Sequence, residues 1–382
     1  MKVLSIVVLI FSLFYYYYCI VTRKTIKAEN TVSEITENSP NSSFTSEKPP
    51  QISSDSNMSV ARFTKNANPY PTYFFSHGGP TFMYENDDFG NKGAWNTIRK
   101  LGKTIKNTWK PDYIIVVSAH WQSGASNLVE VAIPKKDDAE NDLIYDFYGF
   151  PNHMYKEQFH SKNSVYVAEH IRQHLEQNGF NSVLTQRGID HGVWVPFKVA
   201  FSDYNTLSKT EDIPDSPGLD LPETAVIQVS LTANDKDFNS HFKLGEVLSH
   251  FRDNLLWDET QNRYLTGLII CSGMSVHNLR DLGRSFSQPG GIMPYVKPFN
   301  QLLTKTLTKS TDLLADLLEI QSSQKALLYN AHPTLEHFVP VVVASGIANK
   351  NKEPVKELYN AELASLGWGI YQFGPLPVLP KA

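Results

Sequence analysis

The sequence predicts one α/β domain with a mixed or parallel central sheet and helices on both faces. Short, continuously apolar runs such as Tyr113–Ser118 and Leu268–Ser272 are typical of strands buried on both faces. Stretches with helical periodicity lie between these runs, and this alternation is typical of α/β folds. The chain has 382 residues, of which 41% are hydrophobic, so it can bury a large core.

The elements of this domain can be placed one by one along the chain. Four core strands are predicted, at Thr72–Ser76, Tyr113–Ser118, Ala225–Leu231 and Leu268–Ser272. Four helical regions are predicted, at Gly93–Trp109, Ser164–Gln177, near Phe242–Leu255 and over Gln301–Leu328. The stretch Asn205–Glu223 contains several acidic residues and three prolines, so we expect a surface loop there.

The N-terminal end carries an uncharged apolar run at residues 3–22. Twenty such residues are enough to cross a hydrocarbon core of about 30 Å. Residues 1–27 are therefore expected to be a membrane anchor or, alternatively, a signal. A cleaved signal would have a shorter apolar core and a small-residue cleavage site, and Ala28 offers only a poor one. We expect a protein attached to the membrane by a single N-terminal helix.

The side of the membrane stays open at this point. Arg23, Lys24 and Lys27 follow the run, which slightly favours a cytoplasmic domain by the positive-inside rule. Two glycosylation sequons at Asn41 and Asn57 fit the opposite orientation. Residues 28–67 are rich in Ser, Thr and Pro and are expected to be a disordered linker, which leaves residues 68–380 as the catalytic domain.

Charge and cysteine content exclude several classes of function. The net charge is −4, and no stripe of Lys and Arg is present, which argues against a nucleic-acid partner. Cys271 is the only cysteine outside the N-terminal run, so the domain cannot form an internal disulfide or a cysteine-based zinc site. Any metal must be held by His, Asp or Glu. No phosphate-binding glycine loop and no Gly-x-Ser-x-Gly motif is present.

Six of the twelve histidines fall in five short motifs, most of them at the end of a predicted strand or beside Gly or Pro. The motifs are Ser76-His-Gly-Gly-Pro80, Ser118-Ala-His-Trp121, Asp190-His-Gly-Val-Trp-Val-Pro196, Ser272-Gly-Met-Ser-Val-His-Asn-Leu279 and His332-Pro-Thr-Leu-Glu-His337. In open α/β sheets, ligands bind at the carboxyl ends of strands. Because His77, His120 and His277 each follow a strand, their imidazoles can form one face of a metal site there.

Each histidine also has a structural interpretation. A single histidine after a strand is more often a hydrogen-bonded core or loop residue, but several in the same position favour a shared site. On pattern alone, either His332 or His337 could face the metal, since Pro333 is a natural first helical residue. The six histidines outside the motifs are interpreted as surface or packing residues; they are His153, His160, His170, His174, His241 and His250.

These motifs resemble those of the class III extradiol ring-cleaving dioxygenases, specifically the DOPA 4,5-dioxygenase-like subgroup. The resemblance runs from about Tyr70 to Gly374 and includes, in order, HGGP, SAHW, DHGVWVPF, SG-x-x-x-HNLR and HPTLEH-x-x-P. The subgroup usually has HGSP where this chain has HGGP. The resemblance implies an enzyme that inserts O2 into a catechol-type, DOPA-like ring and gives a ring-opened semialdehyde.

The resemblance also implies the metal ligands. His77, His120 and His337 match the residues that coordinate a mononuclear metal, which is Fe(II) in the active enzyme, although Zn(II) is possible in the same site. The wider superfamily uses two histidines and a glutamate, the facial arrangement that leaves positions open. Glu336 therefore stays an alternative to His337 as the third ligand.

Two further histidines are assigned by the same resemblance. His277 matches the active-site histidine expected to act in acid–base catalysis, and in some relatives it also approaches the metal, so it is a possible fourth ligand. His191 is expected to line the substrate pocket and support catalysis there. The expected partners are a small aromatic substrate, O2 and the membrane. One competing function is a zinc-dependent hydrolase that uses the same histidines. The other is a membrane-tethered binding protein on a degenerate enzyme scaffold, but the presence of every motif histidine argues against this second alternative.

Overall fold

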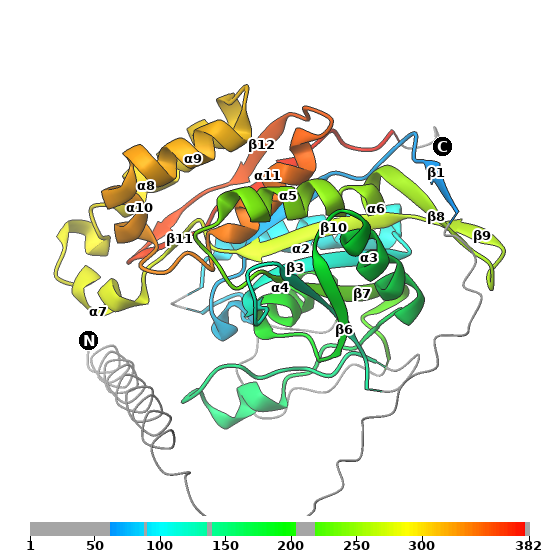
Figure 1. Cartoon of the computed structure of the whole chain (residues 1–382). Helices are drawn as coiled ribbons and strands as arrows, with labels where there is room; N and C mark the ends of the chain where they lie inside the picture. The colour runs from blue at the N-terminus through cyan, green and yellow to red at the C-terminus, as the bar shows by residue number, and fades with distance from the viewer. Residues whose placement is uncertain (1–61, 88–89, 136–139, 204–217, 379–382) are drawn as a thin grey trace, which may run out of the picture. The chain divides into compact units, whose positions relative to one another are not determined.

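The computed structural model describes residues 62–87, 90–135, 140–203 and 218–378. Within these residues a nine-stranded mixed sheet forms the centre of the domain (Figure 1). In order across the sheet the strands are β12 (Val355–Tyr359), β15 (Ile370–Phe373), β2 (Thr72–Ser76), β10 (Gly267–Gly273), β3 (Tyr113–Gln122), β7 (Leu221–Leu231), β4 (Leu128–Ile133) and β6 (Asn181–Gln186), with β5 (Ser161–Lys162) beside β7. The four central strands β2, β10, β3 and β7 are parallel, and β15 and β4 pair antiparallel with them.

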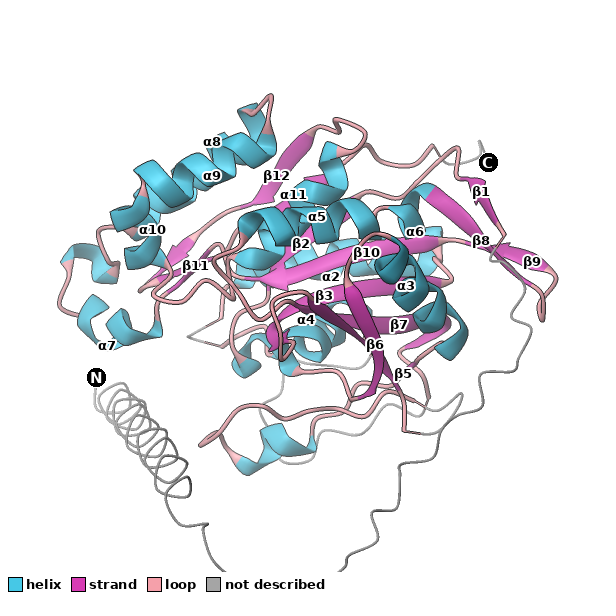
Figure 2. Ribbon diagram, in the orientation of Figure 1, coloured by secondary structure: helices cyan, strands magenta, loops and turns pink. Residues whose placement is uncertain are grey.

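Helices cover both faces of this sheet, as Figure 2 shows. One face is covered by α2 (Lys92–Thr104) and α4 (His191–Phe201), and the other by α3 (Val165–Gln177), α5 (Phe238–Leu248) and α11 (Val339–Asn349). The remaining α-helices are α6 (His250–Asp253), α7 (Leu282–Ser285), α8 (Val296–Lys309), α9 (Leu313–Ser323) and α10 (Lys325–Ala331). The short turns are η1 (Pro80–Met83), η2 (Ile105–Trp109), η3 (Asn152–Lys156), η4 (Leu279–Asp281) and η5 (Pro289–Gly291). The predicted α/β fold is confirmed.

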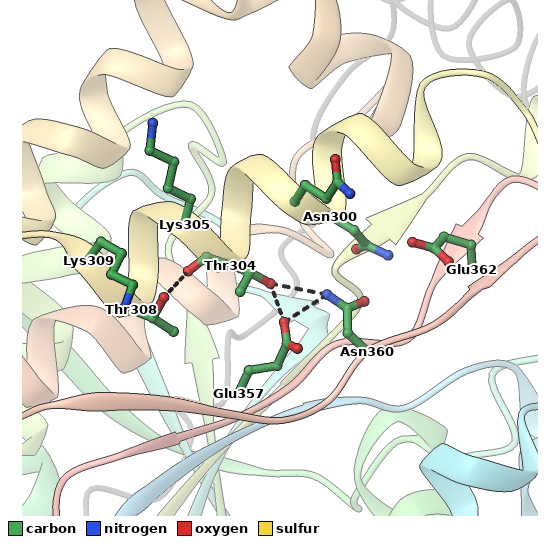
Figure 3. Close-up of a pocket in the computed structure, with 9 residues that line it drawn as sticks. Asn300, Thr304, Lys305, Thr308, Lys309, Glu357, Asn360 and Glu362 are labelled. Carbon is green, nitrogen blue, oxygen red and sulfur yellow. Dashed lines mark hydrogen bonds between the residues drawn. The ribbon is translucent and has the colours of Figure 1, made fainter.

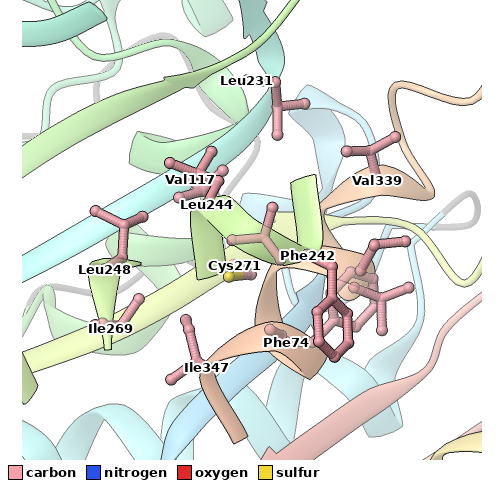
Figure 4. Close-up of a cluster of buried hydrophobic side chains, with 14 of the residues drawn as sticks. Phe74, Val117, Leu231, Phe242, Leu244, Leu248, Ile269, Cys271, Val339 and Ile347 are labelled. Carbon is pink, nitrogen blue, oxygen red and sulfur yellow. The ribbon is translucent and has the colours of Figure 1, made fainter. Parts of the chain in front are cut away.

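The side chains of β3 show why the sheet is covered twice. Ile115 and Val117 join the cluster that contains α5 and α11, whereas Ile114 and Val116 join the cluster that contains α2 and α4. All four are fully buried, and burial of such a side chain contributes roughly 1.5–3 kcal/mol. Figure 4 shows the first cluster, in which residues of β3 and β10 lie against helical side chains. An apolar strand therefore needs a helix on each side.

Two small sheets complete the domain. One consists of β1 (Phe63–Lys65), β8 (Asn254–Asp258) and β9 (Arg263–Leu265), and the other of β11 (Val276–His277), β14 (Leu366–Gly367) and β13 (Glu362–Leu363). β1 lies in residues that the sequence analysis assigned to the linker. The helix expected near Phe242–Leu255 ends earlier, because residues from Asn254 onward pair with β1 and β9 instead.

The helical region expected over Gln301–Leu328 is three helices rather than one. Helix α8 ends where Ser310 adopts an extended backbone conformation. Asp312 then caps a new helix, because its side chain accepts a hydrogen bond from the backbone N–H of Ala315. Because of these breaks the chain changes direction between α8, α9 and α10, and the three helices lie together at one side of the domain (Figure 2).

The expected membrane attachment must be corrected. Among the helices of the described residues, none combines the length and apolar character that a bilayer crossing requires. The run at residues 3–22, on which the expectation of an N-terminal membrane helix and of a membrane-attached location was based, lies outside the described residues.

Candidate metal centre

Two of the motif histidines lie at the carboxyl ends of neighbouring parallel strands. His77 directly follows β2, and His120 is near the end of β3. Strand β10 lies between them, and its Ser272 is in register with Phe75 and Ser118. Because parallel strands end at the same edge of a sheet, this register brings the two imidazoles together. Their Nε2 atoms are 3.1 Å apart.

His337 reaches the same edge from the loop between α10 and α11. Its carbonyl oxygen accepts a hydrogen bond from the backbone N–H of Met274 at 3.0 Å. A Cβ atom on Gly273 would lie 2.3 Å from this oxygen, so only glycine at position 273 permits the approach. His337 Nε2 is 3.3 Å from His120 Nε2. His332, in contrast, turns away, and its Nε2 contacts the carbonyl oxygen of Ser275 at 3.0 Å.

The second nitrogen of each of the three rings has its own hydrogen-bond acceptor or anion. His77 Nδ1 is 2.9 Å from Ser272 Oγ. The Ser272 hydroxyl donates its own hydrogen bond to the carbonyl oxygen of Gly192. The Ser272 oxygen therefore accepts a hydrogen bond from the N–H group at His77 Nδ1. His337 Nδ1 is 3.0 Å from Glu336 Oε1, and His120 Nδ1 is 3.4 Å from Asp146 Oδ2.

The hydrogen bonds place a proton on Nδ1 of His77 and of His337, and the nearby Asp146 carboxylate favours the same form of His120. With each Nδ1 carrying its proton, each neutral imidazole has only a lone pair at Nε2. The three groups offer nitrogen atoms that lie within 4.8 Å of one another. Lone pairs at this separation repel one another unless a cation lies between them. A metal-bound histidine usually donates a hydrogen bond from its other ring nitrogen to an acceptor, so these residues fit a metal ion.

Burial keeps these rings neutral. It lowers the pKa of His77 and of His337 well below the ordinary value, and the neighbouring histidines lower it further. The pKa of His120 is lowered to about 4, first by burial and then by His191, against the opposing effect of Asp190 and Asp146. Because a metal binds only the deprotonated ring, neutral imidazoles are ready to coordinate near neutral pH.

The other two predicted site histidines lie in the same cluster. The ring of His277, on β11, stacks on that of His337 with centroids 3.6 Å apart and an interplanar angle of 15°. His191 is the first residue of α4, and its ring centroid is 4.0 Å from that of His120. Gly192 makes this approach possible, because a Cβ atom there would lie 2.7 Å from His120 Cδ2.

The sequence analysis did not identify Asp146, which contacts two of these histidines. Burial acts to raise the pKa of its carboxyl group, but hydrogen bonds from His191 and the proximity of His120 outweigh this effect and lower the pKa to about 2. Asp146 lies in a loop without an apolar strand before it. No local pattern marked this residue, and only the fold brings it to the histidines.

A separate groove of about 390 Å³ lies between α8 and β12 (Figure 3). Thr304 and Asn360 both donate hydrogen bonds to Glu357 there, and Lys305 and Lys309 project from α8 along the rim. None of the motif histidines lines it. The groove is therefore separate from the histidine cluster.

Comparison with known proteins agrees with the resemblance seen in the motifs. Residues 71–370 match the family model described as the catalytic LigB subunit of aromatic ring-opening dioxygenase. A Schizosaccharomyces pombe protein named "4,5-DOPA dioxygenase extradiol-like protein" is 32% identical over 311 residues, which cover 78% of this chain and 91% of that protein. The "4,5-DOPA dioxygenase extradiol" of Beta vulgaris is 30% identical over 307 residues, 79% of this chain and 94% of that enzyme.

A solved structure supports the fold. The crystal structure of an uncharacterized protein from Escherichia coli K12 superposes with a TM-score of 0.54 and 22% sequence identity, and the match covers 80% of this chain and all of that one. The family match spans most of the chain, including every one of the five histidine motifs. The chain therefore belongs to the LigB family of aromatic ring-opening dioxygenase catalytic subunits.

Proposed function

We propose that this chain is a metal-dependent extradiol dioxygenase that opens a catechol-type ring beside its diol, with His77, His120 and His337 as the metal ligands. The observation that carries the proposal is the close approach of three histidine Nε2 atoms, each on a ring whose Nδ1 faces a hydrogen-bond acceptor or a carboxylate. Relatives named as DOPA dioxygenases support a DOPA-like catechol as the substrate. We propose Fe(II) as the metal of the active enzyme.

The reaction balances without a further reductant, because both atoms of O2 enter the ring and the product is a semialdehyde. When bound, Fe(II) supplies the Lewis acidity and redox chemistry that side chains lack, including a lowered pKa for the catechol hydroxyls. His77, His120 and His337 would hold such a metal from one side, and its remaining positions would be open to the substrate. Holding the reactants together in this way removes an entropic barrier.

In this proposal His277 acts in acid–base catalysis, and His191 positions the substrate. His277 takes a phenolic proton and returns it during ring opening, a role that suits an imidazole. Its stack on His337 places it directly beside a proposed ligand. His191 lines the substrate position and orients the catechol. Both rings lie in the same cluster as the three ligands, so a substrate bound there would contact them.

The test is reconstitution of the metal-free chain with Fe(II) under anaerobic conditions, followed by oxygen-uptake measurements over a panel of catechols that includes DOPA. We expect one O2 consumed per catechol and the appearance of a coloured semialdehyde. A parallel sample loaded with Zn(II) should consume no O2. Hydrolysis of esters or amides by the Zn(II) sample, with no O2 uptake by the Fe(II) sample, would instead support the zinc hydrolase alternative.

A further inference from the structure

One carboxylate, Asp146, lies between a proposed metal ligand and a proposed substrate-binding histidine. Its Oδ1 atom accepts hydrogen bonds from His191 Nδ1 at 2.8 Å and from the backbone N–H of His191 at 2.9 Å. Its Oδ2 atom is 3.4 Å from His120 Nδ1. The two oxygens of a single side chain thus face two different imidazoles of the cluster.

This arrangement determines where the protons of both rings are. A carboxylate only accepts hydrogen bonds, so His191 Nδ1 must carry the proton, and the negative charge of Oδ2 favours a proton on His120 Nδ1 as well. His120 then has its lone pair at Nε2, which faces His77 and His337. His191 likewise has its lone pair at Nε2, and no hydrogen bond to this atom is found within the described part of the chain. His191 Nε2 is therefore available to accept a hydrogen bond from a ligand.

The fold holds Asp146 firmly in this position. The backbone N–H of Ile144 donates to the carbonyl oxygen of Ile189 at 2.9 Å, and the backbone N–H of Ile189 donates to the carbonyl oxygen of Asp142 at 2.8 Å. This bridge joins the loop that carries Asp146 to the turn that leads into His191. Asp146 also lies at the N-terminus of α4, an eleven-residue helix, where the helix dipole stabilises a negative charge.

His277 has no comparable support. Its ring stacks on His337, but among the described residues no hydrogen bond to either of its ring nitrogens is found. The carboxylate of Glu336, which lies close to His277, is already hydrogen-bonded to His337 Nδ1. His191 therefore has a hydrogen-bonded support for its tautomer that His277 lacks within the described residues.

We propose that Asp146 is the positioning residue of this centre, holding His120 and His191 together in the Nδ1–H form so that one presents its Nε2 to the metal and the other to a substrate hydroxyl. The metal half of this proposal stands on the histidine cluster alone. The substrate half rests on the proposed function, because it requires a ligand that donates a hydrogen bond from a hydroxyl group. Loss of the carboxylate should therefore affect both metal affinity and substrate KM.

The first measurement is Zn(II) affinity of the full chain by competition with a chelating dye, which needs no turnover. Asp146→Asn should weaken Zn(II) binding by roughly 10–100-fold, as is typical when the partner of a metal-bound histidine is removed. Asp142→Asn is the matched control, since Asp142 lies in the same loop and pairs with Lys135 at the surface. Equal Zn(II) affinities of the two variants would overturn the metal half.

The second measurement is steady-state kinetics of the Fe(II)-loaded chain with the best catechol. Asp146→Asn and His191→Gln should each raise KM more than they lower kcat, and the double variant should have the KM of His191→Gln alone, because Asp146 acts on the substrate through His191. His191→Gln should keep its Zn(II) affinity. Additive effects on KM would overturn the substrate half.

The third measurement needs no substitution, so it decides the matter even where Asp146→Asn does not fold. The ¹⁵N chemical shifts of the imidazoles in the metal-free chain report which nitrogen carries the proton. We expect Nδ1–H for both His120 and His191, and an Nε2–H form of His191 would overturn the proposal. Should the unsubstituted chain turn over no catechol at all, the proposed function fails, while the dye competition and these spectra still test Asp146.

Discussion

Within the described residues, two pairs of histidine rings stack with similar geometry. At the proposed metal centre, the rings of His277 and His337 stack with centroids 3.6 Å apart and an angle of 15°. Away from the centre, between α3 and α6, the rings of His174 and His250 stack with centroids 4.1 Å apart and an angle of 21°. Ring geometry alone therefore does not separate a functional cluster from a packing one.

The neighbours of the ring nitrogens make the difference. In the second pair, amide groups donate to the rings, Asn178 to His174 at 3.4 Å and Asn254 to His250 at 3.1 Å. An aromatic side chain, Phe63, packs edge-on against His250. At the metal centre, by contrast, Nε2 atoms face other Nε2 atoms. Convergence of lone pairs, and not burial or stacking, is thus the sign of a metal site.

The largest expected effect is loss of metal on removing one of the converging nitrogens. His337→Ala should lose most of the bound metal, because only two of the proposed ligands would remain. The measurement is metal content after reconstitution with Fe(II) or Zn(II) and gel filtration. His250→Ala is the matched control from the packing pair and should keep full metal content. If the His337→Ala protein kept its full metal content, His337 would not be a metal ligand, and the two stacks would no longer differ in function.

A smaller effect is expected for the other ring of the same stack. His277→Gln should keep its metal and still bind catechol, visible as a perturbed catecholate absorption. Its turnover should fall by roughly 10²–10⁴-fold, as is typical for a missing acid–base group. Metal loss as severe as that of His337→Ala would show that His277 is a fourth ligand instead and would contradict the acid–base assignment.

The sequence predicted the parts of this centre that depend on local pattern. Apolar runs such as Tyr113–Ser118 marked the strands, and a histidine after a strand marked the edge where ligands bind. Pattern alone could not choose between His332 and His337, because the choice depends on the approach of the His337 backbone to Gly273. It could not find Asp146 either, since that residue contacts His120 and His191 only through the fold.

The same limit explains the misplaced elements. Residues 254 and 255 were expected to end a helix near Phe242–Leu255, yet they begin β8. One partner of this strand, β9, follows after a short turn, whereas the other, β1, lies almost two hundred residues earlier in the chain. Helical periodicity is a local property and does not show that a distant segment such as β1 will pair with these residues. The helix prediction therefore failed here partly because one of the pairings is non-local.

The smallest expected effect concerns the packing pair and the pH dependence of stability. The pKa of His174 is lowered to about 4, first by burial and then by Lys350, and that of His250 is lowered to about 4 by burial, His174 and Lys350. In the unfolded chain both rings take up a proton near the ordinary value of about 6.5. Between these values the unfolded state binds more protons, so the folded state loses stability as the pH falls from about 6.5 to about 4.

His250→Phe keeps an aromatic ring in the stack and removes one of these titrating groups. The midpoint of thermal unfolding should therefore fall less steeply with decreasing pH in this variant than in the unsubstituted chain, with up to about one proton fewer taken up on unfolding near pH 5. The histidines of the metal centre contribute equally to both proteins in the presence of a chelator, so the difference in slope isolates the packing pair. Identical slopes would mean that His250 gains its proton in the folded state as readily as in the unfolded one. The pair would then be open to water, and it would no longer serve as the packed counterpart of the metal centre.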